Sequence, residues 1–235
     1  MKLDNATVLI TGANRGIGLA FAREALARGA RKVYAAARDP ASVQLDGVEA
    51  LRLDVTRPDD VAAAAQRCRD VTLLINNAGI ARVGGFLAEG SIDAAREQLE
   101  TNFFGPLRLS QAFAPVLAAH GGGAILNVLS IASWINSPLL ATYAATKSAA
   151  WSLTNGLRHE LRAQGTQVLG MHMGFVDTDL TRGIDMPKTT PEDVVRLALD
   201  ALEAGAEEVL ADEITQQIKR GLSADPGVYL QTIAR

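Results

Sequence analysis

Short apolar runs alternate with amphipathic segments along almost the whole chain. Apolar runs at 6–11, 32–37, 48–53, 71–75, 124–129, 167–171 and 207–211 are typical of buried strands. Between them, apolar residues spaced three and four positions apart predict helices at 16–28, 58–69, 91–119, 141–163 and 191–203. This alternation favours an α/β protein with a Rossmann-type doubly wound parallel sheet of about seven strands, flanked by helices on both faces in three layers.

Two regions depart from this pattern. Pro106 and Pro115 are expected to bend or interrupt the long helix at 91–119, because proline removes a backbone donor. From Ser223 onward the pattern predicts no element. Because the chain shows neither an internal repeat nor a linker, we expect a single domain over residues 1–235.

Composition narrows the class of protein. A chain of 235 residues with 48% hydrophobic residues can bury a sizeable core, and a net charge of -3 gives no bias toward nucleic acid or an anionic membrane. The single cysteine, Cys68, excludes an intrachain disulfide and is typical of a reducing compartment. No apolar stretch approaches the length of a membrane span. We therefore expect a cytoplasmic protein without nucleic-acid or membrane partners.

The first strand leads directly into the glycine-rich sequence TGANRGIG at 11–18. Glycine allows a tight turn and close backbone approach, and the helix that follows presents free N–H groups to a pyrophosphate. The spacing differs from the common G-x-G-x-x-G fingerprint. A glycine turn between a first strand and a first helix nevertheless predicts a dinucleotide site, with the cofactor-binding residues Gly12, Asn14, Arg15, Gly16, Ile17 and Gly18.

The end of the second strand indicates which dinucleotide binds. An acid about 20 residues beyond the glycines would accept hydrogen bonds from the ribose of NAD, but Arg38 stands at this place. Its guanidinium, with Arg15 as a second cation, suits a 2′-phosphate and predicts NADP(H). Asp39 keeps an alternative open, since it could form an ion pair with Arg38 or face the ribose of NAD(H).

A candidate catalytic group lies in the stretch 127–147. Tyr143 and Lys147 are four residues apart, so they share one face of the predicted helix. A fixed positive charge favours the phenolate, and we expect Lys147 to lower the pKa of Tyr143 from its usual value of about 10. A tyrosine with a lowered pKa can exchange protons near neutral pH.

These motifs, in this order, resemble the short-chain dehydrogenase/reductase family. The resemblance covers residues from about 6 to 180 and is carried by TGANRGIG, LDV at 53–55, NNAG at 76–79, Asn102, Ser130, and Tyr143 with Lys147. It implies further cofactor-binding residues, namely Asp54, Val55, Asn77, Ala78, Gly79, Tyr143, Lys147, Gly174, Val176 and Thr178. One departure is Met173, where the family usually has proline.

The resemblance also implies a mechanism and an assembly. An NADPH-dependent oxidoreductase would reduce an aldehyde or ketone to an alcohol, with Ser130 bonding the carbonyl oxygen and Tyr143 delivering the proton. Lys147 would lower the tyrosine pKa and bind the ribose, and Asn102 would hold a relay water. Members of the family are often dimers or tetramers, so a homo-oligomer is expected. A non-catalytic NADP(H)-binding regulator and an NAD(H)-dependent alcohol dehydrogenase are the alternatives.

The substrate site is expected in the loops around 80–90, 131–142 and 180–190, because ligands bind beyond the carboxyl ends of parallel strands. Apolar residues in these loops, including Trp134, Leu139 and Met186, predict an open pocket for an apolar small-molecule carbonyl or alcohol. Arg82 and Arg182 are the charged candidates at its rim. None of the three histidines has a metal-ligand partner at useful spacing, so no metal is predicted.

Overall fold

The computed structural model describes residues 1–231 and contains one seven-stranded parallel sheet. Its strand order is β3-β2-β1-β4-β5-β6-β7. The strands are β1 (Thr7–Thr11), β2 (Lys32–Ala37), β3 (Glu49–Arg52), β4 (Leu73–Asn76), β5 (Ala124–Val128), β6 (Gln167–His172) and β7 (Glu208–Leu210). The order reverses between β1 and β4, the point at which open α/β sheets bind ligands.

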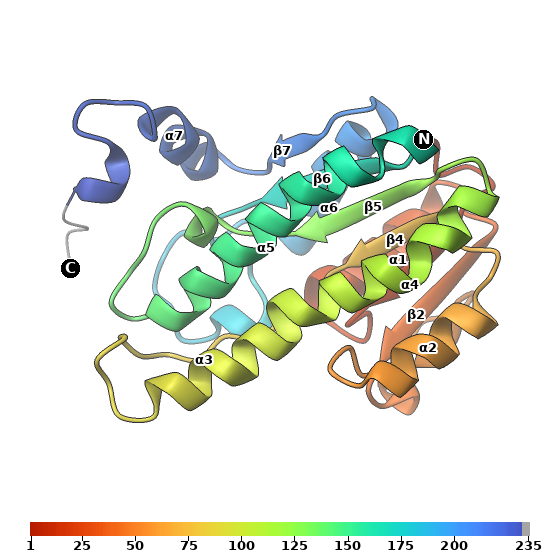
Figure 1. Ribbon diagram of the computed structural model, residues 1–235, viewed down its shortest axis with the longest axis horizontal. Helices are drawn as coiled ribbons and strands as arrows, with labels where there is room; N and C mark the ends of the chain where they lie inside the picture. Colours follow the sequence, from red (N-terminus) through yellow and green to blue (C-terminus); the bar gives the residue numbers. More distant parts are fainter. Residues whose placement is uncertain (232–235) are drawn as a thin grey trace.

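Helices cover both faces of this sheet and confirm the predicted doubly wound, three-layer architecture. The helices are α1 (Gly16–Ala27), α2 (Pro58–Arg67), α3 (Ser91–Leu99), α4 (Gly105–Ala119), α5 (Ala141–Glu160), α6 (Pro191–Glu203) and α7 (Glu213–Gly221). In Figure 1, α2, α4 and α5 lie on the near face of the sheet and α1 and α6 on the far face. The helix α7 lies beyond the edge strand β7 (Figure 1).

Alternate strand residues supply the two cores. In β1, Val8 and Ile10 belong to the core beneath α1 and α6, whereas Leu9 belongs to the core beneath α2, α4 and α5. Phe21 and Phe113, both fully buried, are large side chains of the two respective cores. Since every central strand is covered on both faces, its sequence is a continuous apolar run rather than an alternating one.

The predicted long helix at 91–119 is interrupted, as its prolines suggested. A π-helical turn at Glu100–Phe104 separates α3 from α4, and its hydrogen bond runs from Gly105 N to Glu100 O. Pro106 lies in the first turn of α4, directly after the π-helical turn, whereas Pro115 stays inside the helix. The interruption matters because the π-helical turn places Asn102 toward the centre of the site.

The pattern of apolar residues did not predict α7. This helix is short and mostly polar, and it begins at Asp212, whose carboxylate accepts the Thr215 N–H at 2.8 Å. A further short 3₁₀ turn, Val228–Leu230, follows in the region where no element was expected. The end of the expected domain, residues 232–235, lies outside the described residues.

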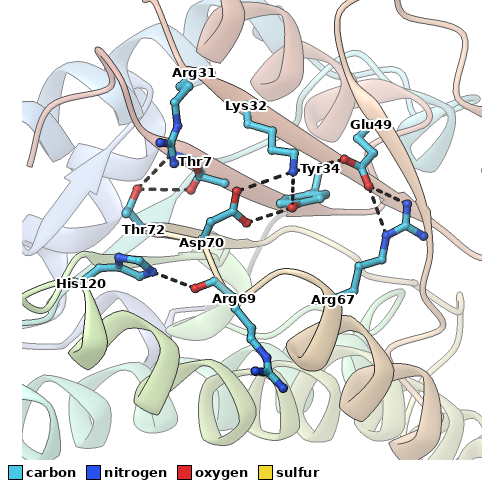
Figure 2. A network of polar contacts seen from close by, with 10 residues as sticks. All are labelled: Thr7, Arg31, Lys32, Tyr34, Glu49, Arg67, Arg69, Asp70, Thr72 and His120. Carbon is cyan, nitrogen blue, oxygen red and sulfur yellow. Dashed lines mark hydrogen bonds and ion pairs between the residues drawn. The ribbon is translucent and has the colours of Figure 1, made fainter.

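A polar network lies at the amino ends of β1, β2 and β3 and in the turn before β4 (Figure 2). Lys32 Nζ lies 2.6 Å from the hydroxyl of Tyr34, which donates to Asp70 at 2.9 Å. Arg67 Nη2 contacts Glu49 Oε1 at 2.6 Å, which joins α2 to β3. The network connects β2 and β3 to α2 and to the turn before β4, so we assign it to stability.

Candidate active site

The predicted site residues gather at the carboxyl ends of β1, β4, β5 and β6. The glycine turn follows β1, Asn77 to Gly79 follow β4, Ser130 follows β5, and Gly174 follows β6. Parallel strands bring these four loops to one edge of the sheet. The arrangement therefore joins segments that are as far as 160 positions apart in the sequence.

The glycine turn has the geometry of a phosphate cradle. Gly12 and Gly16 adopt φ values of +65° and +54°, a region that favours glycine. A Cβ at Gly18 would lie 2.2 Å from Gly12 O, so only glycine allows α1 to start this close to β1. The first turn of α1 contains no acidic residue. Its N–H groups are thus available to an anionic pyrophosphate.

Thr11 connects the glycine turn to the loop after β4. Its hydroxyl accepts the backbone N–H groups of Asn77 and Ala78, each at 3.0 Å. The Asn77 side chain donates to Thr11 O at 2.8 Å and to Gly12 O at 3.2 Å. Asn77 therefore holds the turn with both hydrogens of its side-chain amide. The side-chain oxygen Oδ1 remains available to a cofactor.

Arg38 is exposed at the end of β2 and forms no ion pair with any carboxylate of residues 1–231. Asp39 instead accepts the Ala41 N–H at 3.0 Å and caps the short 3₁₀ turn Pro40–Ser42. Burial opposes ionisation of Asp54, but hydrogen bonds from Thr56, aided by the nearby Arg38 and Arg57, hold the pKa of Asp54 below its usual range. This corner of the site, at the end of β2, thus offers the guanidinium of Arg38, which has no ion-pair partner among residues 1–231.

Arg15 points away from this corner. Its Nη1 lies 3.1 Å from Asp179 Oδ2, and both side chains are exposed. The expected convergence of Arg15 and Arg38 on one phosphate is therefore not formed in this conformation. An exposed pair of this kind is worth at most about 1 kcal/mol, so an incoming phosphate can displace Asp179.

The loop after β6 lies directly over the glycine turn. A Cβ at Gly16 would lie 3.3 Å from Thr178 Cγ2, and Val176 is buried beside them. Backbone bonds between Asp177 N and Thr189 O, and between Thr189 N and Phe175 O, both at 2.9 Å, hold this loop. Thr178 thus lies next to the cradle, and the cofactor-binding roles of Val176 and Thr178 stay predictions.

Ser130 and Tyr143 come together where β5 meets α5. Ser130 is buried, and its Oγ accepts the Ala132 N–H at 3.1 Å, which leaves the hydroxyl hydrogen free to donate elsewhere. The half-buried Tyr143 has a pKa raised to about 12 because burial disfavours the phenolate, and a hydrogen bond with Ser130 offsets only part of this effect. Ser133, the next serine along the chain, is buried at the end of the following 3₁₀ turn.

The expected lowering of the Tyr143 pKa by Lys147 is not found in this conformation, in which burial dominates the pKa. Lys147 Nζ donates to Val128 O at 2.9 Å and lies 5.7 Å from the centre of the Tyr143 ring. Burial lowers the pKa of Lys147 itself to about 8, and the pKa of Tyr143 is raised rather than lowered. Desolvation is the main cause of both shifts, because it disfavours the phenolate of Tyr143 and the ammonium of Lys147.

Asn102 is held by three hydrogen bonds. Its Oδ1 accepts the Ile80 N–H, and its Nδ2 donates to Ile80 O and to Thr146 Oγ1, all at 2.9 Å. Both amide hydrogens are therefore used by protein acceptors. A Cβ at Gly79 would lie 3.3 Å from Asn102 Oδ1 and 3.9 Å from Lys147 Nζ, so the three residues do meet.

A second amide repeats this arrangement one turn earlier. Gln98 is fully buried, accepts the Arg82 N–H at 2.9 Å, and donates to Thr142 Oγ1 at 2.7 Å. Gln98 and Asn102, like their partners Thr142 and Thr146, are four residues apart. The two bridges clamp the loop after β4 to α5 on either side of Tyr143. The sequence carried this signal only as paired i, i+4 polar residues on two helices.

Replacing Gln98 with leucine is expected to destabilise the protein by about 1–3 kcal/mol, because Thr142 and the Arg82 N–H both lose a buried partner. The lower free energy of unfolding would be measured by urea denaturation. Gln111, exposed on α4, provides the control Gln111→Leu, which should change this free energy little. Equal stabilities of the two variants would contradict the clamp.

The loops expected to form the substrate site meet beside Tyr143. Gly84 N donates to Leu139 O at 2.8 Å, and Ala141 N donates to Gly84 O at 3.2 Å. Large apolar side chains stand exposed on these loops and on the segment after Thr178, namely Val83, Phe86, Leu87, Leu139, Leu180 and Met186. The Trp134 ring does not stand free but stacks on His172, with ring centres 4.0 Å apart.

Both candidate arginines at this rim are neutralised by carboxylates. Arg82 makes two hydrogen bonds to Glu97, at 2.8 and 2.6 Å, and Arg182 pairs with Asp179. Among residues 1–231, no cluster of three or more histidine, cysteine or acidic residues is arranged to hold a metal ion. In the same part of the chain, no helix combines the length and apolar character that a membrane span requires.

Taken together, the cradle and the polar group beside it define a nicotinamide-dinucleotide oxidoreductase of the doubly wound class. The family profile described as short chain dehydrogenase matches residues 6–188, and the chain belongs to this short-chain dehydrogenase/reductase family. The chain is 37% identical over 191 residues to galactitol 2-dehydrogenase (L-tagatose-forming) of Cereibacter sphaeroides, covering 77% of this chain and 75% of that protein.

Two solved structures are similar over nearly the full length. A short chain dehydrogenase from Burkholderia cenocepacia in complex with NADP is 38% identical, with a TM-score of 0.94, and the match covers 99% of this chain and 100% of that one. A gluconate 5-dehydrogenase from the same species, in complex with NADP and tartrate, is 26% identical, with a TM-score of 0.83 and coverage of 92% and 97%.

Proposed function

We propose that this chain is an NADPH-dependent reductase of uncharged, apolar aldehydes or ketones. The observation that carries the proposal is the convergence of Ser130, Tyr143 and Lys147 beside a phosphate cradle whose adenosine corner holds the unpaired Arg38. The loops around 80–90, 131–142 and 180–190 form the substrate site in this proposal.

The residues present fit NADP(H). The free N–H groups of α1 suit the pyrophosphate, and Arg38 suits the 2′-phosphate. Asp39, which would face the ribose of NAD(H), is used as a helix cap instead. The similar Burkholderia cenocepacia structure is a complex with NADP, which supports the same choice. When bound, NADPH supplies the hydride for the reaction.

The proposed chemistry uses three side chains around the carbonyl. The Ser130 hydroxyl donates to the carbonyl oxygen, where negative charge develops. The Tyr143 hydroxyl gives its proton to that oxygen, and its high pKa keeps it protonated before the reaction. The ammonium of Lys147 stabilises the resulting phenolate, and its bond to Val128 O would exchange for a ribose hydroxyl. A relay water would be held by an oxygen of Asn102, since both Nδ2 hydrogens are already donated.

The rim favours an uncharged substrate. Arg82 is paired with Glu97, and Arg182 shares Asp179 with Arg15, so a charged substrate would first have to displace these carboxylates. Apolar side chains such as Val83 and Leu139 are 80% and 68% exposed on the surrounding loops. Burying them against a substrate would contribute about 25 cal/mol per Å².

Initial rates of NADPH and NADH oxidation with a panel of carbonyls would test the proposal. The panel should pair apolar aldehydes and ketones with keto acids and keto sugars of similar size. We expect higher kcat/KM with NADPH and with the uncharged apolar members. Tight NADPH binding without turnover of any member would instead favour a non-catalytic regulator, and a preference for NADH would favour the alcohol dehydrogenase alternative.

We predict that the rate of carbonyl reduction falls as pH rises through about 8, the lowered pKa of Lys147. Above this pH the ammonium is lost and no longer stabilises the phenolate, whereas Tyr143, with its pKa raised to about 12, stays protonated. A profile of kcat against pH would show this alkaline limb. In Lys147→Arg the limb should move upward, since guanidinium keeps its charge. A wild-type profile that is flat to pH 10 would contradict the assignment.

A further inference from the structure

His172 is a buried residue that the proposed chemistry does not use. It is the last residue of β6 and is fully buried. Its Nδ1 lies 3.2 Å from the backbone carbonyl oxygen of Ser130, which also accepts the Ser133 N–H at 3.0 Å. The imidazole therefore contacts the backbone of the residue that is proposed to bind the carbonyl oxygen.

The contact fixes the tautomer of this imidazole. A carbonyl oxygen only accepts hydrogen bonds, so Nδ1 must carry the hydrogen. Burial lowers the pKa of His172 to about 4, so the ring is neutral near pH 7. Nε2 then holds a lone pair, and it has no hydrogen-bond partner among the described residues. It lies 3.7 Å from Glu208 Oε1, beyond hydrogen-bond distance.

A stack of side chains connects His172 to the C-terminal helix. The Trp134 ring, which follows the 3₁₀ turn after Ser130, lies 4.0 Å from the imidazole at an interplanar angle of 21°. Lys219 of α7 places its ammonium 4.7 Å from the centre of the Trp134 ring, where cation–π attraction operates. The same ammonium lies 2.8 Å from Glu208 Oε1 and offsets the carboxylate that faces His172.

The other end of α7 holds the loop after β6. Asp212, which caps α7, accepts the Gly174 N–H at 2.7 Å. A Cβ at Gly174 would lie 2.9 Å from Ile214 Cγ2, so the helix packs directly against this glycine. One short helix therefore contacts both sides of the candidate site, through Lys219 on the Ser130 side and through Asp212 on the Gly174 side.

We propose that α7 braces the active site, with His172 as a positioning residue that holds the Ser130 backbone through its Nδ1–H and with Trp134 and Lys219 locking the imidazole in place. This inference rests on the proposed function, in which Ser130 binds the carbonyl oxygen. Displacement of the Ser130 carbonyl would move the hydroxyl of the same residue and would misplace the donor that the developing charge requires.

Two substitutions at His172 separate its hydrogen bond from its packing. His172→Phe keeps a ring on Trp134 but removes the donor, and His172→Asn keeps a donor near Nδ1 but removes the ring. We expect His172→Phe to lower kcat by roughly threefold to tenfold, the loss of one hydrogen bond, with KM and the Kd of NADPH nearly unchanged. His172→Asn should recover most of kcat.

Lys219→Met tests the same brace from α7 and keeps the apolar stem of the side chain. Hydrogen exchange of the full-length protein should become faster for the backbone amides of 130–136 in this variant, and kcat should fall. Arg220, exposed on the same helix and without an ion pair among the described residues, provides the control Arg220→Met. Should His172→Phe fail to fold, Lys219→Met decides the question.

The outcomes distinguish the brace from the underlying function. Wild-type kcat in His172→Phe and Lys219→Met, or exchange of 130–136 as slow as in the wild type, would overturn the brace while leaving the reductase intact. If the wild-type protein reduced no carbonyl, the proposed function would fail. Hydrogen exchange of the backbone amides of 130–136 would then decide whether α7 holds this segment. Unchanged exchange in Lys219→Met would overturn the proposed bracing by α7.

Discussion

Tyr143→Phe is expected to lower kcat for carbonyl reduction by about 10²–10⁴-fold, the usual contribution of a general acid or base. The substitution removes only the hydroxyl, so the ring and its packing on α5 remain. Because the cradle and Arg38 lie at other loops, the Kd of NADPH should stay nearly unchanged. Steady-state kinetics and fluorescence titration with NADPH would measure the two quantities separately.

Tyr229, which is 58% exposed near the C-terminal end of the described chain, provides the control. Tyr229→Phe removes the same hydroxyl from a solvated position and should leave kcat unchanged. A Tyr143→Phe enzyme that keeps a tenth or more of wild-type kcat would overturn the assignment of the proton donor. Loss of NADPH binding in this variant would instead indicate a role of the hydroxyl in holding the cofactor.

The shifted pKa values explain why this tyrosine suits reduction. Burial raises the pKa of Tyr143 to about 12 and lowers that of Lys147 to about 8, so each group favours its neutral form. A phenol at this pKa retains its proton until a stronger base, the developing alkoxide, is present. Lys147 then supplies the charge that the phenolate needs, provided that the lysine is protonated. The proposed direction of the reaction and the predicted alkaline limb thus have one physical origin.

The sheet and the cradle could be predicted from the sequence because their signals are local. A strand buried on both faces is an apolar run, and a turn with positive φ requires glycine, as at Gly12 and Gly16. By contrast, α7 is polar and only nine residues long, so periodicity does not separate it from a loop. Its role depends on tertiary contacts of Asp212 and Lys219.

The sequence also could not predict which groups the charged side chains of the site contact. The guanidinium of Arg15 contacts Asp179, a residue 164 positions away, rather than the corner that Arg38 occupies. Lys147 donates its hydrogen bond to a backbone carbonyl rather than to the hydroxyl of the tyrosine one turn before it. Neither contact is visible in the local sequence. The i, i+4 spacing shows that Tyr143 and Lys147 are neighbours, but it does not show how polar their surroundings are.

Arg38→Ala is expected to weaken NADPH binding by roughly 1–3 kcal/mol, the cost of a lost charged hydrogen bond, and to affect NADH little. Arg38 forms no ion pair with a carboxylate of the described residues, so the guanidinium is available to the 2′-phosphate that only NADPH carries. Titration calorimetry with both cofactors would measure the difference, and raised salt should reduce it.

Two further variants make this experiment decisive. Arg23, exposed on α1 and without an ion pair among residues 1–231, provides the charge-matched control Arg23→Ala, which should bind both cofactors as the wild type does. Asp39→Asn keeps the capping oxygen that accepts the Ala41 N–H and should leave NADH binding unchanged. Equal losses for NADPH and NADH in Arg38→Ala would refute the 2′-phosphate assignment. A selective loss of NADH in Asp39→Asn would place the ribose of NAD(H) at Asp39, because a carboxylate accepts both ribose hydroxyls whereas an amide cannot.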